Sequence, residues 1–233
     1  MGGCGCQGSA YGPAKCCHDH LKMDWHVCSG NTRRPPTSPM HDPATHASIV
    51  RAFAALPHCV PDALAALFTP RAVERGQPLL RQGELWDKAF VIHSGLLRMC
   101  FTRRDGREFN KNFHSEGMLV CPITDAMAQQ PSLFSIHAVQ VSTVLQASAQ
   151  AMRECLGRDN AWEPLRALLL ERLVTHKLER EHLLLAMDGR SRYAHFCRTA
   201  PHLAERVPLA QLATYLGMTD VSLSRIRRTP EKP

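Results

Sequence analysis

The segment from Val207 to Arg228, VPLAQLATYLGMTDVSLSRIRR, constrains the fold of this chain more than any other segment. Its first half repeats apolar residues at helical spacing until Gly217 interrupts the pattern. Thr219 and Asp220 follow, and both residue types begin helices because their side chains accept hydrogen bonds from free backbone N–H groups. The second half is short and rich in serine and arginine. This order is typical of a DNA-binding helix-turn-helix, although an ordinary helical hairpin with a basic surface has the same pattern.

Positive charge accumulates at the same end of the chain. The formal net charge of all 233 residues is +7, and from Asp188 onward eight lysines and arginines stand against four aspartates and glutamates. More than half of the net charge therefore lies in about the last fifth of the sequence. Because clustered positive charge attracts polyanions, we expect double-stranded DNA to be the partner of residues 188–233.

The composition also bears on the compartment. No stretch approaches the roughly 18 consecutive apolar residues of a transmembrane helix, and the first residues lack the pattern of a signal peptide. We therefore expect a cytoplasmic protein with no membrane partner. In that compartment its ten cysteines should be mostly reduced thiols.

Residues 1–45 differ in composition from the rest, because glycine, proline, serine, cysteine and histidine dominate them. Thiolates and imidazoles are ligands of zinc and of iron–sulfur clusters. The cysteines of this segment are Cys4, Cys6, Cys16, Cys17 and Cys28. Their spacing lacks the paired C-x-x-C motifs of a strong metal site. The segment is therefore predicted to be a disordered extension, with an iron–sulfur or zinc site at these cysteines as the alternative.

The pattern of residues 46–157 predicts a small antiparallel β-roll. Two short helical patterns between Ala47 and Leu67 come first, and short β segments separated by glycines follow. Asp105-Gly106, flanked by LLRMCFT and REFNKNF, is the strongest short-range hairpin signal. The predicted strands are 72–75, 78–81, 88–93, 96–102, 135–143 and 144–149, and short helices are predicted at 123–128 and 151–156.

Residues 161–187 form the longest stretch with helical periodicity. Pro164 falls in the first turn, where its missing N–H group costs little. A helix of this length is about 40 Å long, more than a small roll can cover. We therefore predict that part of its apolar stripe forms a dimer interface through Leu165, Leu169, Leu173, Leu183 and Met187. A long helix that packs within its own domain is the alternative. Another helix, 190–199, should end before Pro201.

Several short motifs occur in a consistent order along residues 47–228. They are Leu80-Arg81-Gln82-Gly83-Glu84 with Asp87 and Gly95, Asp105-Gly106-Arg107-Glu108, Pro131-Ser132 followed by Ser135-Ile136-His137-Ala138, and Arg192-Tyr193 before the helix-turn-helix. Together they resemble the cyclic-AMP receptor protein and fumarate–nitrate reduction regulator (Crp-Fnr) superfamily of bacterial transcription regulators. The resemblance implies an α+β fold with an N-terminal antiparallel β-roll like the cyclic-nucleotide-binding jelly roll. A long dimerisation helix and a C-terminal helix-turn-helix with a shortened wing complete it.

The resemblance also implies a function. A homodimer would bind double-stranded DNA without a required cofactor, couple a signal sensed by the roll to promoter binding, and contact RNA polymerase as a further partner. Base-reading positions of the family match Asp220, Val221, Ser224 and Arg225, with Ser222 facing outward beside them. Thr219, Arg227 and Arg228 match phosphate-contacting positions. The guanidinium of Arg225 presents two donors to guanine, and such a bidentate contact favours guanine over other bases by about 1–3 kcal/mol.

Two differences from the family pattern bear on which effector this protein could sense. Members that bind cyclic AMP hold its phosphate with an arginine, but the corresponding regions here read Glu116-Gly117-Met118-Leu119 and Phe134-Ser135-Ile136-His137. An anionic phosphate would lack its bidentate partner, so we predict an atypical member that does not sense cyclic AMP and whose effector is unknown. The redox branch combines N-terminal cysteines with a roll cysteine, for which Cys100 and Cys121 are candidates. Because the spacing differs, an iron–sulfur redox sensor is the alternative function.

Enzymatic activity has little support in the sequence. It contains no glycine-rich phosphate loop, no H-E-x-x-H motif and no G-x-S-x-G nucleophile elbow. His93, His114 and His137 are isolated and have the setting of ordinary strand residues. We therefore predict a protein that is not an enzyme.

Overall fold

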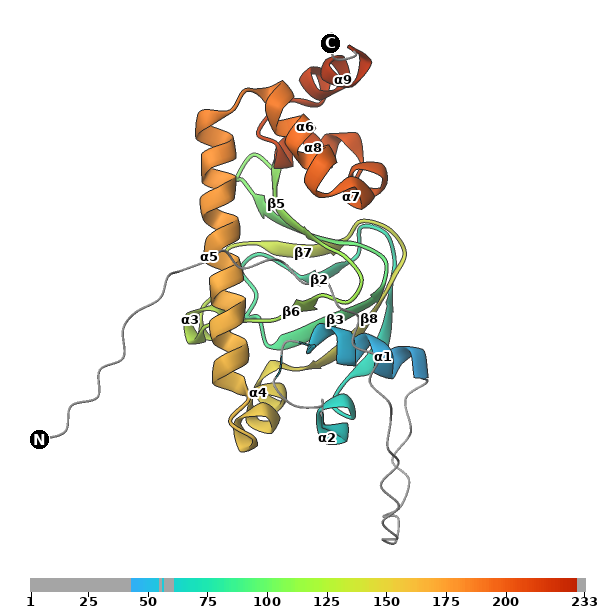
Figure 1. Cartoon of the computed structure of the whole chain (residues 1–233), viewed down its shortest axis with the longest axis vertical. Coiled ribbons are helices and arrows are strands. Elements are labelled where there is room, and N and C mark those ends of the chain that lie inside the picture. The colour runs from blue at the N-terminus through green and yellow to red at the C-terminus, as the bar shows by residue number, and fades with distance from the viewer. Residues whose placement is uncertain (1–42, 55, 57–60, 230–233) are drawn as a thin grey trace, which may run out of the picture. The chain divides into compact units, whose positions relative to one another are not determined.

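The structure is a computed structural model that describes residues 43–54, 56 and 61–229. Its central feature is a roll of two antiparallel four-stranded sheets, with strand orders β1-β8-β3-β6 and β2-β7-β4-β5 (Figure 1). The strands of the first sheet are β1 (Thr69–Val73), β3 (Lys88–Ser94), β6 (Leu119–Val120) and β8 (Ser142–Ser148). Those of the second are β2 (Pro78–Leu80), β4 (Leu97–Thr102), β5 (Glu108–His114) and β7 (Ser135–Ala138).

The core of the roll lies between the two sheets. Phe90 and Ile92 of β3 meet Leu97 and Met99 of β4 and Ile136 of β7 in one apolar cluster. Alternation along β4 therefore turns Arg98 and Cys100 toward the outer face of the second sheet. The alternate residues of β3, Ala89 and Val91, are also buried, because helices cover the outer face of the first sheet. Cover on both faces explains why the four central residues of β3, Ala89–Ile92, are all apolar.

Three short helices and the start of a long one provide that cover. They are α1 (Pro43–Ala52), α2 (Asp62–Ala65), α4 (Ala149–Arg158) and the first turns of α5 (Trp162–Ala186). Helix α1 begins inside the segment predicted as a disordered extension. The cysteines predicted as metal ligands, Cys4, Cys6, Cys16, Cys17 and Cys28, lie outside the described residues.

The roll departs from the predicted strands mainly at the turn before β8. The predicted strand 135–143 ends at Ala138, and β8 begins at Ser142. The Ser142 hydroxyl donates to the carbonyl oxygen of Gln140 at 2.8 Å and accepts from the amide of Leu96 at 3.2 Å. Gly95 passes so close that a Cβ atom there would lie 2.1 Å from this hydroxyl oxygen, and its φ is +105°. Only glycine fits that turn.

Helices follow the roll to the end of the described chain. After α5 come α6 (Gly189–Thr199), α7 (Pro201–Arg206), α8 (Leu209–Tyr215) and α9 (Asp220–Arg228). Figure 1 shows α5 along one side of the roll and the last four helices near β5. The prediction that Pro201 only ends a helix was incomplete, because Pro201 also starts α7, where a missing N–H group costs nothing.

Residues in the turn between α8 and α9 explain where α8 ends and where α9 begins. Gly217 takes a φ of +67° after α8, a conformation that favours glycine. The Thr219 hydroxyl then accepts a hydrogen bond from the amide of Ser222 at 3.1 Å and caps α9. Within the described part of the chain, no helix has the length and apolar character to cross a membrane.

Candidate nucleic-acid interface and its contacts with the roll

One exposed face of α9 gathers most of the residues predicted to contact DNA. Asp220, Val221, Ser224, Arg225 and Arg228 line an open groove of about 460 Å³, together with Leu209 and Thr229. The opposite side of α9 holds the helix in place, because Leu223 is fully buried in the cluster shared with α8. Val221 is 62% exposed although it is apolar. The groove therefore presents two guanidinium groups, two hydroxyl side chains, two apolar side chains and the carboxylate of Asp220 to a ligand.

The remaining predicted DNA contacts lie elsewhere on α9. The hydroxyls of Thr219 and Ser222 lie 2.8 Å apart and take part in the N-cap. Arg227 is exposed but is not among the groove-lining residues of the described chain. One of the two cap hydroxyls donates to the other, so the second O–H can donate to a phosphate, and the exposed guanidinium of Arg227 adds positive charge.

The apolar face of α5 predicted to form the dimer interface is turned toward the chain's own roll and terminal helices. Leu165 is only 3% exposed and belongs to the core beneath the first sheet, so its prediction as an interface residue was wrong. Leu169 and Leu173 line a cavity against the roll, and Leu183 lines one against Phe113 and Tyr215. Met187 is half-buried at the end of the helix.

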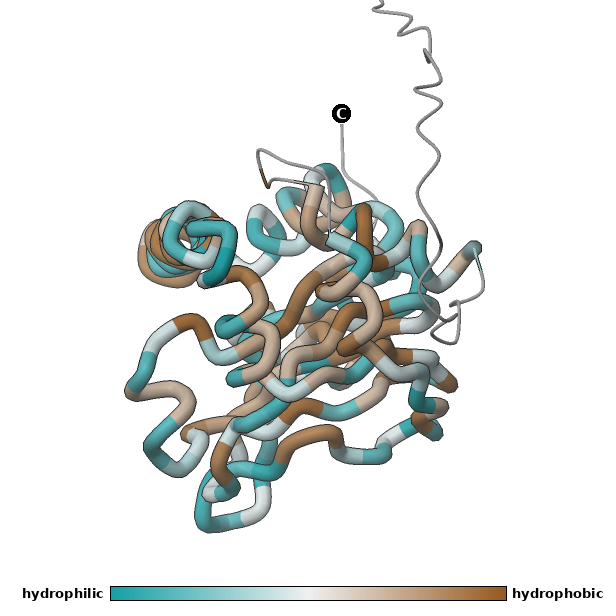
Figure 2. The backbone as a smooth tube through the Cα atoms, turned by 90° about the horizontal axis from the view of Figure 1, so that it is seen from below, coloured by the Kyte–Doolittle hydropathy of each residue, from teal (hydrophilic) through white to brown (hydrophobic). Residues whose placement is uncertain are grey.

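A second apolar stripe lies on the opposite side of α5. Val174, Leu178 and Leu185 are 55%, 62% and 80% exposed. At about 100° per residue, these three side chains lie within roughly 40° of one another. Figure 2 views α5 nearly along its axis, with apolar residues on the helix beside the roll. Among the described residues, this stripe is more exposed than the predicted one, whose Leu169, Leu173, Leu183 and Met187 are only partly buried.

An ion pair joins the roll to the terminal helices. Arg206 of α7 donates to both carboxylate oxygens of Glu116 at 2.7 and 2.9 Å, and to the carbonyl oxygen of Gly95 at 2.8 Å. Glu116 also accepts from the amide of Gly95 at 2.9 Å. The hydrogen bonds from Arg206 are the main reason that the pKa of Glu116 is lowered to about 2. No local signal in the sequence reveals the pair, since its members are 90 residues apart.

A second junction connects β5 with α8. The side-chain amide of Asn110 donates to the carbonyl oxygen of Gln211 at 3.0 Å and to the hydroxyl of Thr214 at 2.8 Å. Arg180 of α5 donates to the carbonyl oxygen of Tyr215 at 2.7 Å, and its guanidinium carbon lies 4.2 Å from the centre of the Tyr215 ring. These contacts place the helix-turn-helix directly on the outer face of the second sheet.

We expect the Glu116–Arg206 pair to stabilise the folded chain in a pH-dependent way. The pKa of Glu116 is lowered from 4.5 to about 2, so its contribution is present above pH 4.5 and is lost as the pH falls toward 2. Both side chains are partly exposed, and solvent screening limits the effect to about 1 kcal/mol. Urea unfolding of Glu116→Gln should show this loss at pH 7 and convergence with the wild type at low pH. The exposed Glu74→Gln serves as a control, and equal stability of Glu116→Gln and wild type at pH 7 would contradict the assignment.

Between the roll and α5, buried polar groups line a cavity of about 80 Å³. Neither ring nitrogen of His114 has a hydrogen-bond partner in the described chain, nor does the indole nitrogen of Trp86. Burial, followed by the charges of Lys111 and His176, lowers the pKa of His114 to about 4, so its imidazole is neutral at pH 7. Burial also lowers the pKa of Lys111 to about 8. Phe134 packs edge-on against Trp86 inside the roll, with ring centres 5.5 Å apart.

A larger cavity of about 340 Å³ shares part of the same lining. Both cavities are bordered by Lys111, His114, Leu169 and Leu173, and the larger one also by Lys177. The lining therefore combines apolar groups from α5 with cationic groups from β5 and α5. Its polar atoms could bind a small ligand that contacts the roll and the long helix together.

Comparison with known proteins agrees with this architecture. Residues 70–159 match the profile of the family described as "Cyclic nucleotide-binding domain". The structure resembles FixK2 from Bradyrhizobium japonicum, with a TM-score of 0.61 and 17% identity over 69% of this chain and 82% of that chain. It also resembles a CooA mutant from Carboxydothermus hydrogenoformans, with a TM-score of 0.57 and 19% identity over 72% and 77% of the respective chains.

A third similar structure is CLP from Xanthomonas campestris, which is described as a c-di-GMP responsive global regulator linking cell–cell signalling to virulence gene expression. Its TM-score is 0.58, with 14% identity over 78% of this chain and 89% of that chain. A search of curated proteins found no match. The similar structures confirm the predicted α+β fold, a jelly roll followed by helices, and confirm the resemblance to Crp-Fnr regulators in fold.

Proposed function

We propose that this chain is a homodimeric, sequence-specific DNA-binding transcription regulator that couples a signal at its roll to promoter binding. The observation that carries the proposal is the exposed face of α9, where Asp220, Val221, Ser224, Arg225 and Arg228 share one groove. Arginine and serine can bond to base edges and phosphates, and Val221 can contact a thymine methyl group. The likeness in fold to CLP, itself described as a regulator of gene expression, favours this class of protein over an enzyme.

Dimerisation would use the exposed stripe of α5. Val174, Leu178 and Leu185 are an apolar set that the other residues of the described chain leave exposed. Two copies packed along this stripe would bury it and present two α9 helices to adjacent turns of DNA. RNA polymerase, as a further partner, rests on the resemblance to the Crp-Fnr superfamily alone.

The signal would act between the roll and α5. Among the described residues, the ring nitrogens of His114 and the indole nitrogen of Trp86 have no hydrogen-bond partner, and with the nearby Lys111 they suit a small polar ligand. Phe134 and Trp86 fill the interior of the roll with apolar surface, which does not complement a cyclic phosphate. We therefore propose an effector other than cyclic AMP.

A metal- or iron–sulfur-dependent redox sensor is the second candidate. It rests on the cysteine content of residues 1–45. Anaerobic purification followed by metal analysis and an absorbance spectrum distinguishes the two, since colourless, metal-free protein that still binds DNA would exclude an iron–sulfur requirement.

Selection of bound DNA from a random pool tests the proposed function most directly. We expect enrichment of a palindrome whose half-sites lie about one helical turn apart, because a two-fold dimer presents two equivalent α9 helices. Affinity should fall steeply with added salt, because neutralised phosphates release counterions. Recovery of no motif, or binding by a monomer without sequence preference, would contradict the proposal.

A further inference from the structure

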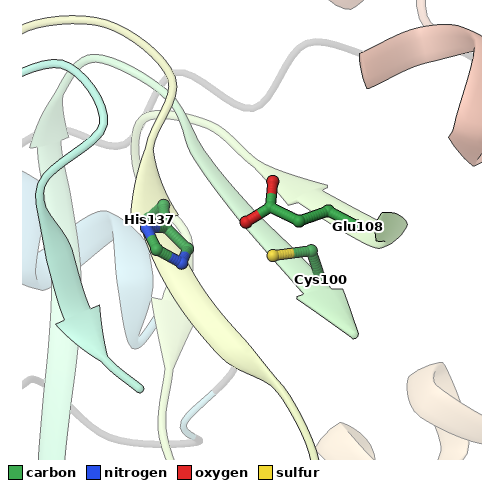
Figure 3. A group of neighbouring side chains, drawn as sticks. All are labelled: Cys100, Glu108 and His137. Carbon is green, nitrogen blue, oxygen red and sulfur yellow. The ribbon is translucent and has the colours of Figure 1, made fainter. Parts of the chain in front are cut away.

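Three side chains with metal-binding chemistry meet on the outer face of the second sheet. Cys100 comes from β4, Glu108 from β5 and His137 from β7, and their ligand atoms all lie within 4.8 Å of one another. Figure 3 shows the thiol, the carboxylate and the imidazole turned toward a common point. None of them belongs to the roll core or to the α9 groove.

We infer that Cys100, Glu108 and His137 form a site for a divalent transition-metal ion of the zinc type. Sulfur, nitrogen and oxygen donors together match the ligand preference of such an ion, which calcium and magnesium do not share. Bonds of about 2.0–2.3 Å require the three donors to approach one another by about 1 Å. Three protein ligands would leave a fourth position for water or another small ligand.

The hydrogen bonds of His137 already suit an ion. Its Nδ1 lies 3.2 Å from the carbonyl oxygen of Gly76. A carbonyl oxygen only accepts, so Nδ1 carries the hydrogen and Nε2 carries the lone pair of the neutral ring. Metal-bound histidines are commonly oriented by such a bond from the other ring nitrogen.

Glu108 is oriented in a similar way. Arg98 donates to Glu108 Oε2 at 2.5 Å and to Asn110 Oδ1 at 3.1 Å. The Glu108 carboxylate also faces the Cys100 thiol, so an ion would bind between these two groups with Arg98 as an outer partner. Because thiolate is the form that ligates metals, binding would form a metal–sulfur bond and release the Cys100 thiol proton to solvent.

The position of this site connects it to the helix-turn-helix. Arg98 joins Glu108 to Asn110, and Asn110 bonds to Gln211 and Thr214 of α8. An ion that draws Glu108 toward Cys100 would weaken the hydrogen bond from Arg98 to Glu108. Because Arg98 also bonds to Asn110, the position of α8 on β5 would change as well. This consequence rests on the proposed function, whereas ion binding itself does not.

Titration with Co²⁺ tests the site in a full-length chain whose five N-terminal cysteines are changed to serine, which removes the other expected thiolate ligands. We expect one equivalent to bind and to produce a sulfur-to-cobalt charge-transfer band. Cys100→Ser should abolish that band, and His137→Gln should weaken binding by roughly 10-fold or more. Excess Zn²⁺ should remove the band from the unsubstituted site by displacing Co²⁺.

Cys197→Ser is the control, because Cys197 is a partly exposed cysteine outside the cluster, and it should leave the band unchanged. If Cys100→Ser does not fold, His137→Gln still decides the matter, because His137 lies at the partly exposed side of the cluster. Absence of binding, or a band that survives both substitutions, would overturn the inference. Neither result depends on DNA binding, which a separate titration with and without Zn²⁺ measures.

Discussion

Replacing Arg225 with alanine is expected to remove most of the sequence specificity of DNA binding. Arg225 is exposed in the α9 groove beside Ser224 and Val221. A guanidinium that donates to both O6 and N7 of guanine discriminates by about 1–3 kcal/mol. The proposed dimer makes this contact in each half-site, so affinity for the selected palindrome should fall by roughly 30-fold to 2 × 10⁴-fold, while binding to random DNA changes little.

Fluorescence anisotropy with the selected palindrome and with random duplex of equal length measures both quantities at fixed salt. Arg225→Lys keeps the charge but loses the two parallel donors, and should resemble the alanine variant in specificity. Arg228→Ala should weaken binding to both duplexes alike, as expected of a phosphate contact. Because Arg225 is exposed, its replacement should change stability by no more than about 0.5 kcal/mol. An equal loss on both duplexes after Arg225→Ala would show that Arg225 contacts phosphates only.

If the chain forms the proposed homodimer, replacing Leu178 with glutamate is expected to convert it to monomers. Leu178 is 62% exposed in the single chain and lies between Val174 and Leu185 on the free stripe of α5. A dimer would bring two glutamates together on an apolar surface, where burial of unpaired charge is costly. Specific DNA affinity should fall with it, because a monomer engages one half-site.

Sedimentation at micromolar concentration reports the oligomeric state. Leu178→Met conserves volume and apolar character and should remain dimeric. Leu165→Ala tests a residue of the predicted interface for comparison. Leu165 is buried in the chain's own core, so its truncation should lower folding stability by about 2–5 kcal/mol. A Leu178→Glu protein that stays dimeric would place the interface elsewhere.

Local chemistry alone determined several features of this protein. Gly217 and the Thr219 cap locate the turn of the helix-turn-helix, and each acts on backbone within a few residues. The hairpin at Asp105-Gly106 is equally local, since Asp105 accepts from the amide of Arg107. Helical periodicity predicted α5 within one residue at each end. Such features depend only on residues that are close in the sequence, so the sequence alone predicts them.

Tertiary structure decided which surfaces these elements expose. The sequence of α5 carries two apolar stripes, and periodicity cannot tell which one the chain's own roll will cover. The sequence also does not show that Cys100, Glu108 and His137 lie close together. In the sequence His137 looks like an ordinary strand residue, and only the pairing of β7 with β4 brings it near the other two. The pairing of Glu116 with Arg206 likewise depends on contacts between distant segments. Residue type and spacing thus determined the elements and the basic face of α9, whereas long-range packing decided which side chains meet.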